Sequence, residues 1–121
     1  MPVNNCLFIL STPPHGSAVA QETLDVILMY AAFGVPVTLL FIGDGIFQLK
    51  KNQSTAPLQL KNFSAIFRAM KDYDIDNVYA DESAMTARSI QLADLLIDVT
   101  PLDAQRQSQL IESADLVFNL S

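Results

Sequence analysis

The stretch LFILSTPPHGS, residues 7–17, decides the fold expected of this chain. Its first four residues form an apolar run of strand length, and the turn at residues 11–17 separates that run from a segment with helical periodicity. A buried parallel strand that leads into its crossover helix has this pattern. In open parallel sheets, ligands and partners gather outside the carboxyl ends of the strands. The turn is therefore the first place to look for function.

The alternation of apolar runs and helical segments continues along the chain. Further strands are expected at residues 37–42, 77–80, 95–97 and 116–120. Helices are expected from about residue 18 to Gly34, with Ser17 as the cap, and at residues 62–71 and 102–113, with short helical turns at residues 46–49 and from residue 81. This order predicts an α/β fold of three layers, α/β/α, with a five-stranded, mostly parallel sheet. The long connection after Ile42 predicts that the chain crosses the sheet at least once.

Length and charge narrow the class of protein. A chain of 121 residues, half of them hydrophobic, predicts one domain over residues 1–121. The net charge of −6 argues against direct nucleic-acid binding, which needs a basic surface. One cysteine excludes an internal disulfide framework and fits a reducing compartment. No secretion leader opens the chain and no apolar run approaches the roughly 18 residues of a membrane span, so we expect a cytoplasmic protein that does not bind membranes.

The turn at residues 11–17 permits two interpretations. Its hydroxyls and Gly16 would suit a phosphate cradled on backbone N–H groups, as in flavodoxin-like folds. Pro13 and Pro14 cannot donate an N–H, so ordinary turn chemistry is favoured. His15 could act as an acid, a base or a partner contact near neutral pH. Without a nucleophile beside it, a structural or interface role is favoured for His15.

Three other features contain residues that could carry chemistry. In Gly43-Asp44-Gly45, we interpret the glycines as conformational and Asp44 as a helix cap. Cys6 begins the first strand, at the end of the sheet opposite the turns, and is expected to be a buried structural thiol. Asp74, Asp81 and Glu82 could suggest a metal or a carboxylate pair, but a solvated helix start explains them as well. We therefore predict no catalytic residue, no cofactor and no metal.

Five segments together carry a resemblance to a known family. They are FILSTPPHG at residues 8–16, LFIGDGIFQL at residues 40–49, YDI at residues 73–75 and TPL at residues 100–102, with residues 22–28 between the first two. The chain resembles the DsrE/DsrF-like family, specifically its TusC/DsrF branch, over essentially its whole length.

This resemblance implies a subunit of a sulfur relay, in which persulfide sulfur passes between cysteines toward 2-thiouridine at the tRNA wobble position. It also implies assembly with TusB-like and TusD-like subunits in a heterohexamer, with only an indirect link to tRNA. In active members of the family the carrier cysteine follows the strand that corresponds to residues 78–80. Here Asp81 and Glu82 occupy that position, and a carboxylate cannot hold a persulfide. The resemblance therefore implies a non-catalytic subunit.

Two alternatives stay open at this point. The chain could be a flavodoxin-like domain that binds a phosphate or flavin at residues 11–17, or a DsrF-like subunit in sulfur oxidation. If it assembles, we expect recognition by His15, Gly16, Asp44 and Phe47, because the apolar segment at residues 46–49 follows a strand-end turn. The same segment would allow the purified chain to associate with itself.

Overall fold

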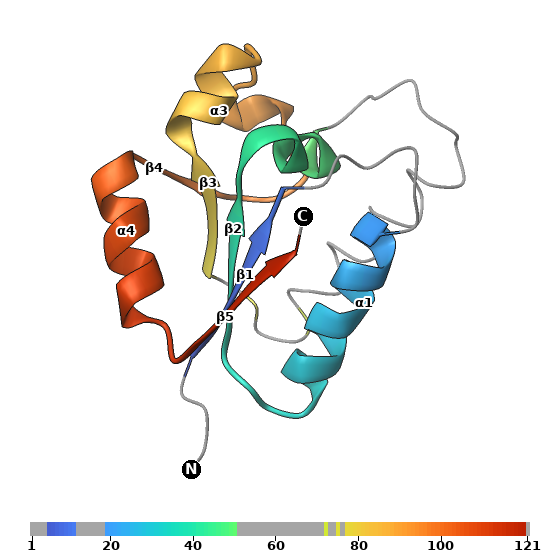
Figure 1. Ribbon diagram of the computed structural model, residues 1–121. Coiled ribbons are helices and arrows are strands. Elements are labelled where there is room, and N and C mark those ends of the chain that lie inside the picture. The colour runs from blue at the N-terminus through green and yellow to red at the C-terminus, as the bar shows by residue number, and fades with distance from the viewer. Residues whose placement is uncertain (1–4, 12–18, 51–71, 73–74, 76, 121) are drawn as a thin grey trace.

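Five parallel strands form a single sheet between helices in the computed structural model, which describes residues 5–11, 19–50, 72, 75 and 77–120 (Figure 1). The strands are β1 (Cys6–Leu10), β2 (Val37–Phe41), β3 (Asn77–Asp81), β4 (Thr100–Leu102) and β5 (Leu116–Leu120). The helices are α1 (Val19–Ala32), α3 (Glu82–Ala87) and α4 (Ala104–Ser113), and the short 3₁₀ helices are η1 (Gly43–Leu49) and η2 (Leu92–Asp94). The predicted three-layer α/β architecture is thus confirmed.

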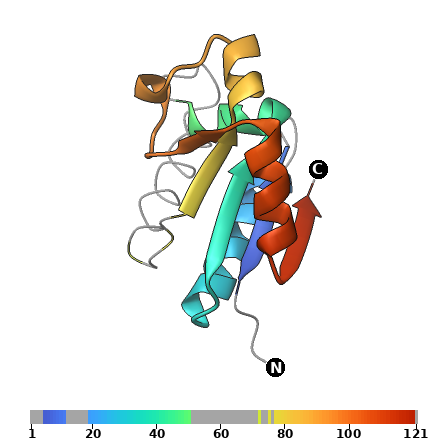
Figure 2. The same cartoon turned by 90° about the vertical axis from the view of Figure 1, so that its left-hand side faces the viewer.

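The sheet order is β4-β3-β2-β1-β5, and every neighbouring pair is parallel. Strands β2, β3 and β4 each lie beside the strand that precedes them in the chain, so the connection after Ile42 leads to the adjacent strand. The crossing occurs later, because the chain passes from β4 at one edge through α4 to β5 at the other edge (Figure 2). The predicted switch in direction therefore exists, but α4 makes it.

The main core lies between the sheet and α1. Leu24 and Ile27 of α1 are fully buried against alternate strand residues such as Phe8 and Leu39. Gly34 ends α1 with φ of +83°, where a side chain would be strained. The Gly34 N–H donates to Ala31 O (2.9 Å) and the Val35 N–H to Tyr30 O (3.2 Å), which is the Schellman arrangement. The predicted stop at Gly34 is confirmed, and it directs the chain into β2.

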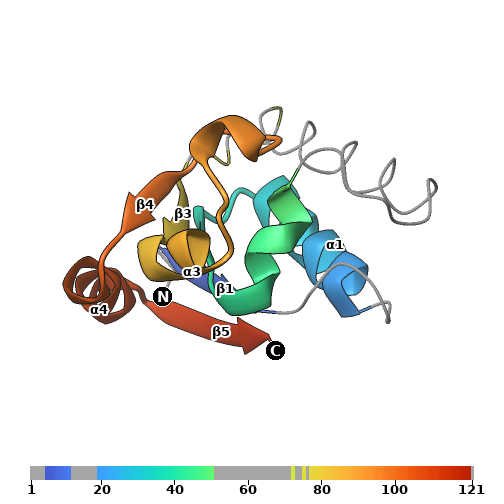
Figure 3. The same ribbon diagram turned by 90° about the horizontal axis from the view of Figure 1, so that it is seen from above.

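A smaller core lies on the opposite face of the sheet, under α4. Leu7, Ile9 and Leu40 are buried there, and Leu110 of α4 and Ala114, which follows α4, pack against them. Viewed from above, α4 lies on one side of the sheet and α1 on the other (Figure 3). Asp103 caps α4, because its side chain accepts a hydrogen bond from the Arg106 N–H (2.9 Å). Of the two adjacent apolar residues of α4, Leu110 packs inward and Ile111 is exposed.

The fourth strand lies later in the chain than predicted. The apolar segment at residues 95–97 is not a strand, and residues 100–102 form β4 instead. Leu95 makes an isolated antiparallel bridge with Lys50, and the Leu96 N–H donates to Leu49 O (2.7 Å). The segment therefore covers the end of η1. Pro101 fits β4 because an edge strand does not need every N–H.

Two predicted features lie outside the described residues. They are the Ser17 cap together with the turn at residues 12–17, and the helix at residues 62–71.

Candidate functional site at the carboxyl edge of the sheet

The carboxyl ends of β2 and β3 continue directly into η1 and α3, and these two elements contact each other. The close seating of η1 depends on Gly45. A Cβ atom at Gly45 would clash with the carbonyl oxygen of Leu10 at the end of β1. Glycine at this position therefore lets η1 rest on the end of β1. The side chains of η1 and α3 form the surface of this edge.

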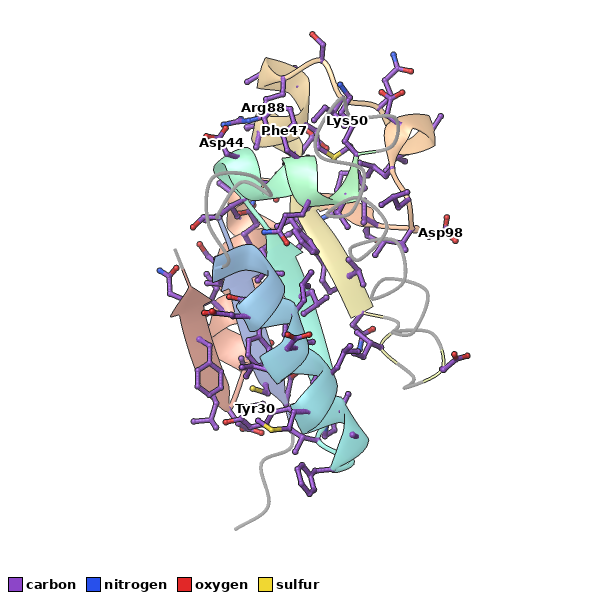
Figure 4. The ribbon with its side chains drawn as sticks, turned by 90° about the vertical axis from the view of Figure 1, so that its right-hand side faces the viewer. Tyr30, Asp44, Phe47, Lys50, Arg88 and Asp98 are labelled. Atoms are coloured by element: carbon purple, nitrogen blue, oxygen red, sulfur yellow. The ribbon has the colours of Figure 1, made fainter. Side chains whose placement is uncertain are left out.

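An ion pair joins η1 to α3. Arg88 Nε and Nη2 both donate to Oδ1 of Asp44, at 3.1 and 2.9 Å, and Arg88 Nη1 donates to Ala84 O at 3.2 Å. The Arg88 guanidinium carbon also lies 6.0 Å from the centre of the Phe47 ring, within cation–π range. Figure 4 shows these three side chains grouped at one end of the molecule. The group presents a carboxylate, a guanidinium and an aromatic ring on one surface.

The structure corrects the role expected for Asp44. The N-cap of η1 is Ile42, and no side chain caps it. Asp44 lies in the first turn and binds Arg88 instead. With 57% of the Asp44 side chain and 25% of the Arg88 side chain exposed, the pair is accessible to a partner and contributes little to stability. Sequence reasoning missed Arg88, because the two residues are 44 positions apart and no local pattern links them.

Asp81 at the end of β3 is engaged in structural contacts. Its Oδ1 accepts hydrogen bonds from the Ser83 N–H (3.2 Å) and from Nε2 of Gln107 (2.9 Å). The same Gln107 nitrogen donates to Leu102 O (3.0 Å), so it connects the ends of β3 and β4 to α4. Glu82, the next residue, is exposed. The predicted helix start after the third strand is confirmed, with Asp81 as its cap.

The apolar segment at residues 46–49 belongs largely to the core. Ile46, Gln48 and Leu49 are buried, which contradicts their assignment to a leftover surface. The reason is that η1 folds back over the end of the sheet and turns these side chains inward. Phe47 is half-buried, packs against the core and keeps part of its ring accessible. Phe47 is therefore the one residue of this segment that can contact a partner.

Cys6 lies at the opposite end of β1, as expected. Its side chain is fully buried, at 0% exposure, and burial raises the pKa of its thiol. A raised pKa lowers the thiolate fraction at neutral pH, and the thiolate is the reactive form. The geometry of Cys6 therefore suits packing and opposes sulfur transfer.

His15 and Gly16 lie outside the described residues, so the structure does not place them beside Asp44 and Phe47.

Among the residues that the structure does describe, no group of three or more His, Cys, Asp or Glu side chains gathers as a metal site would require. Within the same residues no helix is long and apolar enough to cross a membrane. The described part of the carboxyl edge carries the charged side chains of Asp44 and Arg88 and the aromatic ring of Phe47.

Comparison with known proteins assigns the chain to a family. The sequence model of the DsrE/DsrF-like family matches residues 4–120. The chain belongs to the DsrE/DsrF-like family, as the motifs at residues 8–16 and 40–49 indicated.

Named relatives and a solved structure agree with this assignment. The chain is 32% identical to "Intracellular sulfur oxidation protein DsrF" of Allochromatium vinosum, over 97% of this chain and 96% of the relative. It is 34% identical to "Protein TusC homolog" of Vibrio vulnificus, over 91% and 94%. The crystal structure of the YchN protein from E. coli has the same fold, with a TM-score of 0.78 at 16% identity, over 96% of this chain and 98% of that one. The resemblance to the TusC/DsrF branch is thereby confirmed.

Proposed function

We propose that this chain is a TusC-like subunit of a sulfur relay complex and that it does not itself carry the persulfide. The observation that carries the proposal is the loop after β3. There Asp81 caps α3 and binds Gln107, and Glu82 lies exposed beside it. Neither carboxylate can form a persulfide, and the chain's one thiol is buried at the other end of the sheet.

In this proposal the chain contributes recognition. TusB-like and TusD-like subunits would contact the carboxyl edge through Asp44, Phe47 and the turn that contains His15 and Gly16. Sulfur would pass between cysteines of the partners toward 2-thiouridine at the tRNA wobble position, in the cytoplasm and within a heterohexamer. The acidic net charge of −6 supports an indirect link to tRNA.

The proposal is tested by following sulfur. Incubated with a cysteine desulfurase and ³⁵S-labelled cysteine, the wild-type chain should acquire no stable persulfide, and Cys6→Ser should behave identically. Glu82→Cys provides the positive control, because it places an exposed thiol at the position of the family's carrier. That variant should accept label and should react with iodoacetamide faster than Cys6 does. Stoichiometric label on wild-type Cys6 would refute the assignment.

Assembly is tested separately. Native mass spectrometry after coexpression with TusB-like and TusD-like chains should show all three in one complex. Recovery of this chain free of both partners would contradict the role of a relay subunit. A yellow protein or a bound phosphorylated molecule would instead favour the flavodoxin-like alternative.

A second pathway is supported by the relative named for sulfur oxidation, which matches 97% of this chain. A DsrF-like subunit would serve the oxidation of stored sulfur. Complementation separates the two roles. Restored 2-thiouridine in the tRNA of a strain that lacks its TusC supports the tRNA pathway, whereas restored sulfur oxidation in a strain that lacks DsrF supports the other.

A further inference from the structure

The β5 edge of the sheet carries unused hydrogen-bonding groups. Among the described residues, β5 pairs only with β1, so its outer side has no neighbouring strand (Figure 3). The Leu116 N–H donates to Asn5 O, at 3.2 Å, and so points toward β1. Successive residues of a strand direct their N–H and C=O groups to opposite sides. The backbone groups of Val117 and Asn119 therefore point outward.

The side chains of β5 do not hinder pairing of this edge with another strand. Leu116 and Val117 are each 42% exposed, and Phe118 is half-buried. Natural proteins protect an edge strand with Lys, Pro, a bulge or short length. The other edge, β4, has three residues and includes Pro101, whereas β5 has five residues, LVFNL, with neither a charge nor a proline. Strand β5 thus has the properties of a strand that pairs with another chain.

We propose that β5 pairs antiparallel with β5 of a second copy of this chain, about a two-fold axis at Phe118. In this register Val117 of each copy lies opposite Asn119 of the other, and each such pair exchanges two backbone hydrogen bonds. The two five-stranded sheets then join into one. The proposal concerns a surface other than the carboxyl edge and stands apart from the proposed function.

Two observations favour a second copy as the occupant. The outward groups of Val117 and Asn119 are symmetric about Phe118, so the edge is complementary to itself, as an isologous interface requires. The strand also lacks charged side chains, so two chains of net charge −6 can meet there without like charges directly opposed.

Helix α1 extends the same surface. The Tyr30 ring of α1 lies 5.7 Å from the Phe118 ring, so this flank of α1 adjoins β5. Val26 precedes Tyr30 by four residues, shares its flank and is 38% exposed. A two-fold axis perpendicular to the sheet keeps both copies of α1 on one face and turns these flanks toward each other. Pairing at β5 would therefore cover Val26.

The first test uses proline, which removes an N–H donor. By sedimentation equilibrium, the purified chain should show a dimer of twice its 13.3 kDa mass. Val117→Pro removes two intermolecular hydrogen bonds from the dimer and should raise its Kd about thirtyfold, with the fold intact. Leu116→Pro is the matched control, because it breaks the bond to β1 and should lower the urea midpoint instead. A wild-type chain that stays monomeric at its highest soluble concentration overturns the proposal. In that case β5 would pair with a segment of the same chain or with a different partner.

The second test determines the register in which the two β5 strands pair. Val117→Cys and Asn119→Cys chains should form little disulfide when each is oxidised alone, because each cysteine lies opposite the other position. A mixture of the two should form a disulfide-linked dimer, since the paired Cα atoms lie about 5.5 Å apart. Cross-linking that is equal in all three samples, or absent from the mixture, overturns the register.

The third test probes α1. Val26→Lys should raise the Kd of the dimer about tenfold, because it places a like charge at the contact of the two flanks. Ala32→Lys is the control, since Ala32 is exposed and lies on the opposite flank of α1 from Tyr30. Equal effects of the two substitutions would remove α1 from the interface.

Discussion

Cys6 illustrates how position in the sheet controls the chemistry of a residue. The thiol lies in the first position of β1, is fully buried and has a raised pKa because burial disfavours the thiolate. A chain with one cysteine could appear in sequence to be a sulfur carrier. Burial at the end of the sheet opposite the carboxyl edge disfavours this role for Cys6, in line with the proposed function.

The raised pKa of the Cys6 thiol predicts how the free energy of unfolding changes with pH. Below the ordinary thiol pKa of 9.0, Cys6 is protonated in both the folded and the unfolded chain. As pH rises through 9.0, the unfolded chain loses this proton first, so the free energy of unfolding should fall, by up to about 1.4 kcal/mol per pH unit. Urea titrations of the wild-type chain and Cys6→Ala at pH values on both sides of 9.0 isolate the contribution. Parallel curves for the two proteins would contradict it.

Arg88 shows the opposite case, a residue whose importance emerges only in three dimensions. In the sequence it is one of seven scattered cations. In the structure it ends α3, binds Asp44 and lies near the Phe47 ring. A recognition surface that combines η1 and α3 therefore depends on a contact that no sequence spacing indicates.

Among the elements, η1 determines the shape of the carboxyl edge. It buries Ile46 and Leu49, contacts α3 and rests on the end of β1 through Gly45. The G-D-G motif thus serves packing through Gly45 and surface chemistry through Asp44. The helix cap that the sequence predicted at Asp44 is therefore wrong.

Substitution at Gly45 should reveal this packing. Gly45→Ala is expected to lower the free energy of unfolding by about 1–3 kcal/mol, because its Cβ would displace the Leu10 carbonyl and η1 would have to shift. Gly43→Asn is the control: the site of its Cβ is open, and Asn tolerates the positive φ of +50° better than most residues. Urea denaturation followed by circular dichroism measures both. Equal losses in the two variants would show that the lack of space at position 45 adds nothing to the cost of replacing a glycine in η1.

At the scale of the whole molecule, the two nominated surfaces lie in different places. The carboxyl edge carries Asp44, Phe47 and Arg88, whereas the β5 edge runs along the side of the sheet. Under the two proposals, the partner subunits would bind at the carboxyl edge and the second copy would bind at β5. The two associations can be disrupted independently.

Removal of the exposed carboxylate tests the carboxyl edge. Asp44→Ala should weaken binding to the TusB-like and TusD-like partners about tenfold, because Arg88 loses the group that orients it. The monomer should lose less than about 1 kcal/mol of stability, since the Asp44 side chain is more than half exposed and solvent screens the ion pair. Asp98→Ala removes an exposed carboxylate elsewhere and serves as the control (Figure 4). Gel filtration of the mixed subunits provides the measurement, and unchanged binding by Asp44→Ala would exclude that residue from the interface.

The sequence by itself determined the α/β class, four of the five strands, the end of α1 at Gly34, the burial of Cys6 and the family. These features depend on local patterns, because continuous apolar runs, helical spacing and glycine positions act within a few residues. Only the tertiary structure decided the sheet order, the place of β4, the burial of Ile46 and Leu49, and the pairing of Asp44 with Arg88. Each of these depends on which distant segments meet. Residues 95–97 are as apolar as a strand, but they cover η1 because the space beside β3 is taken by residues 100–102.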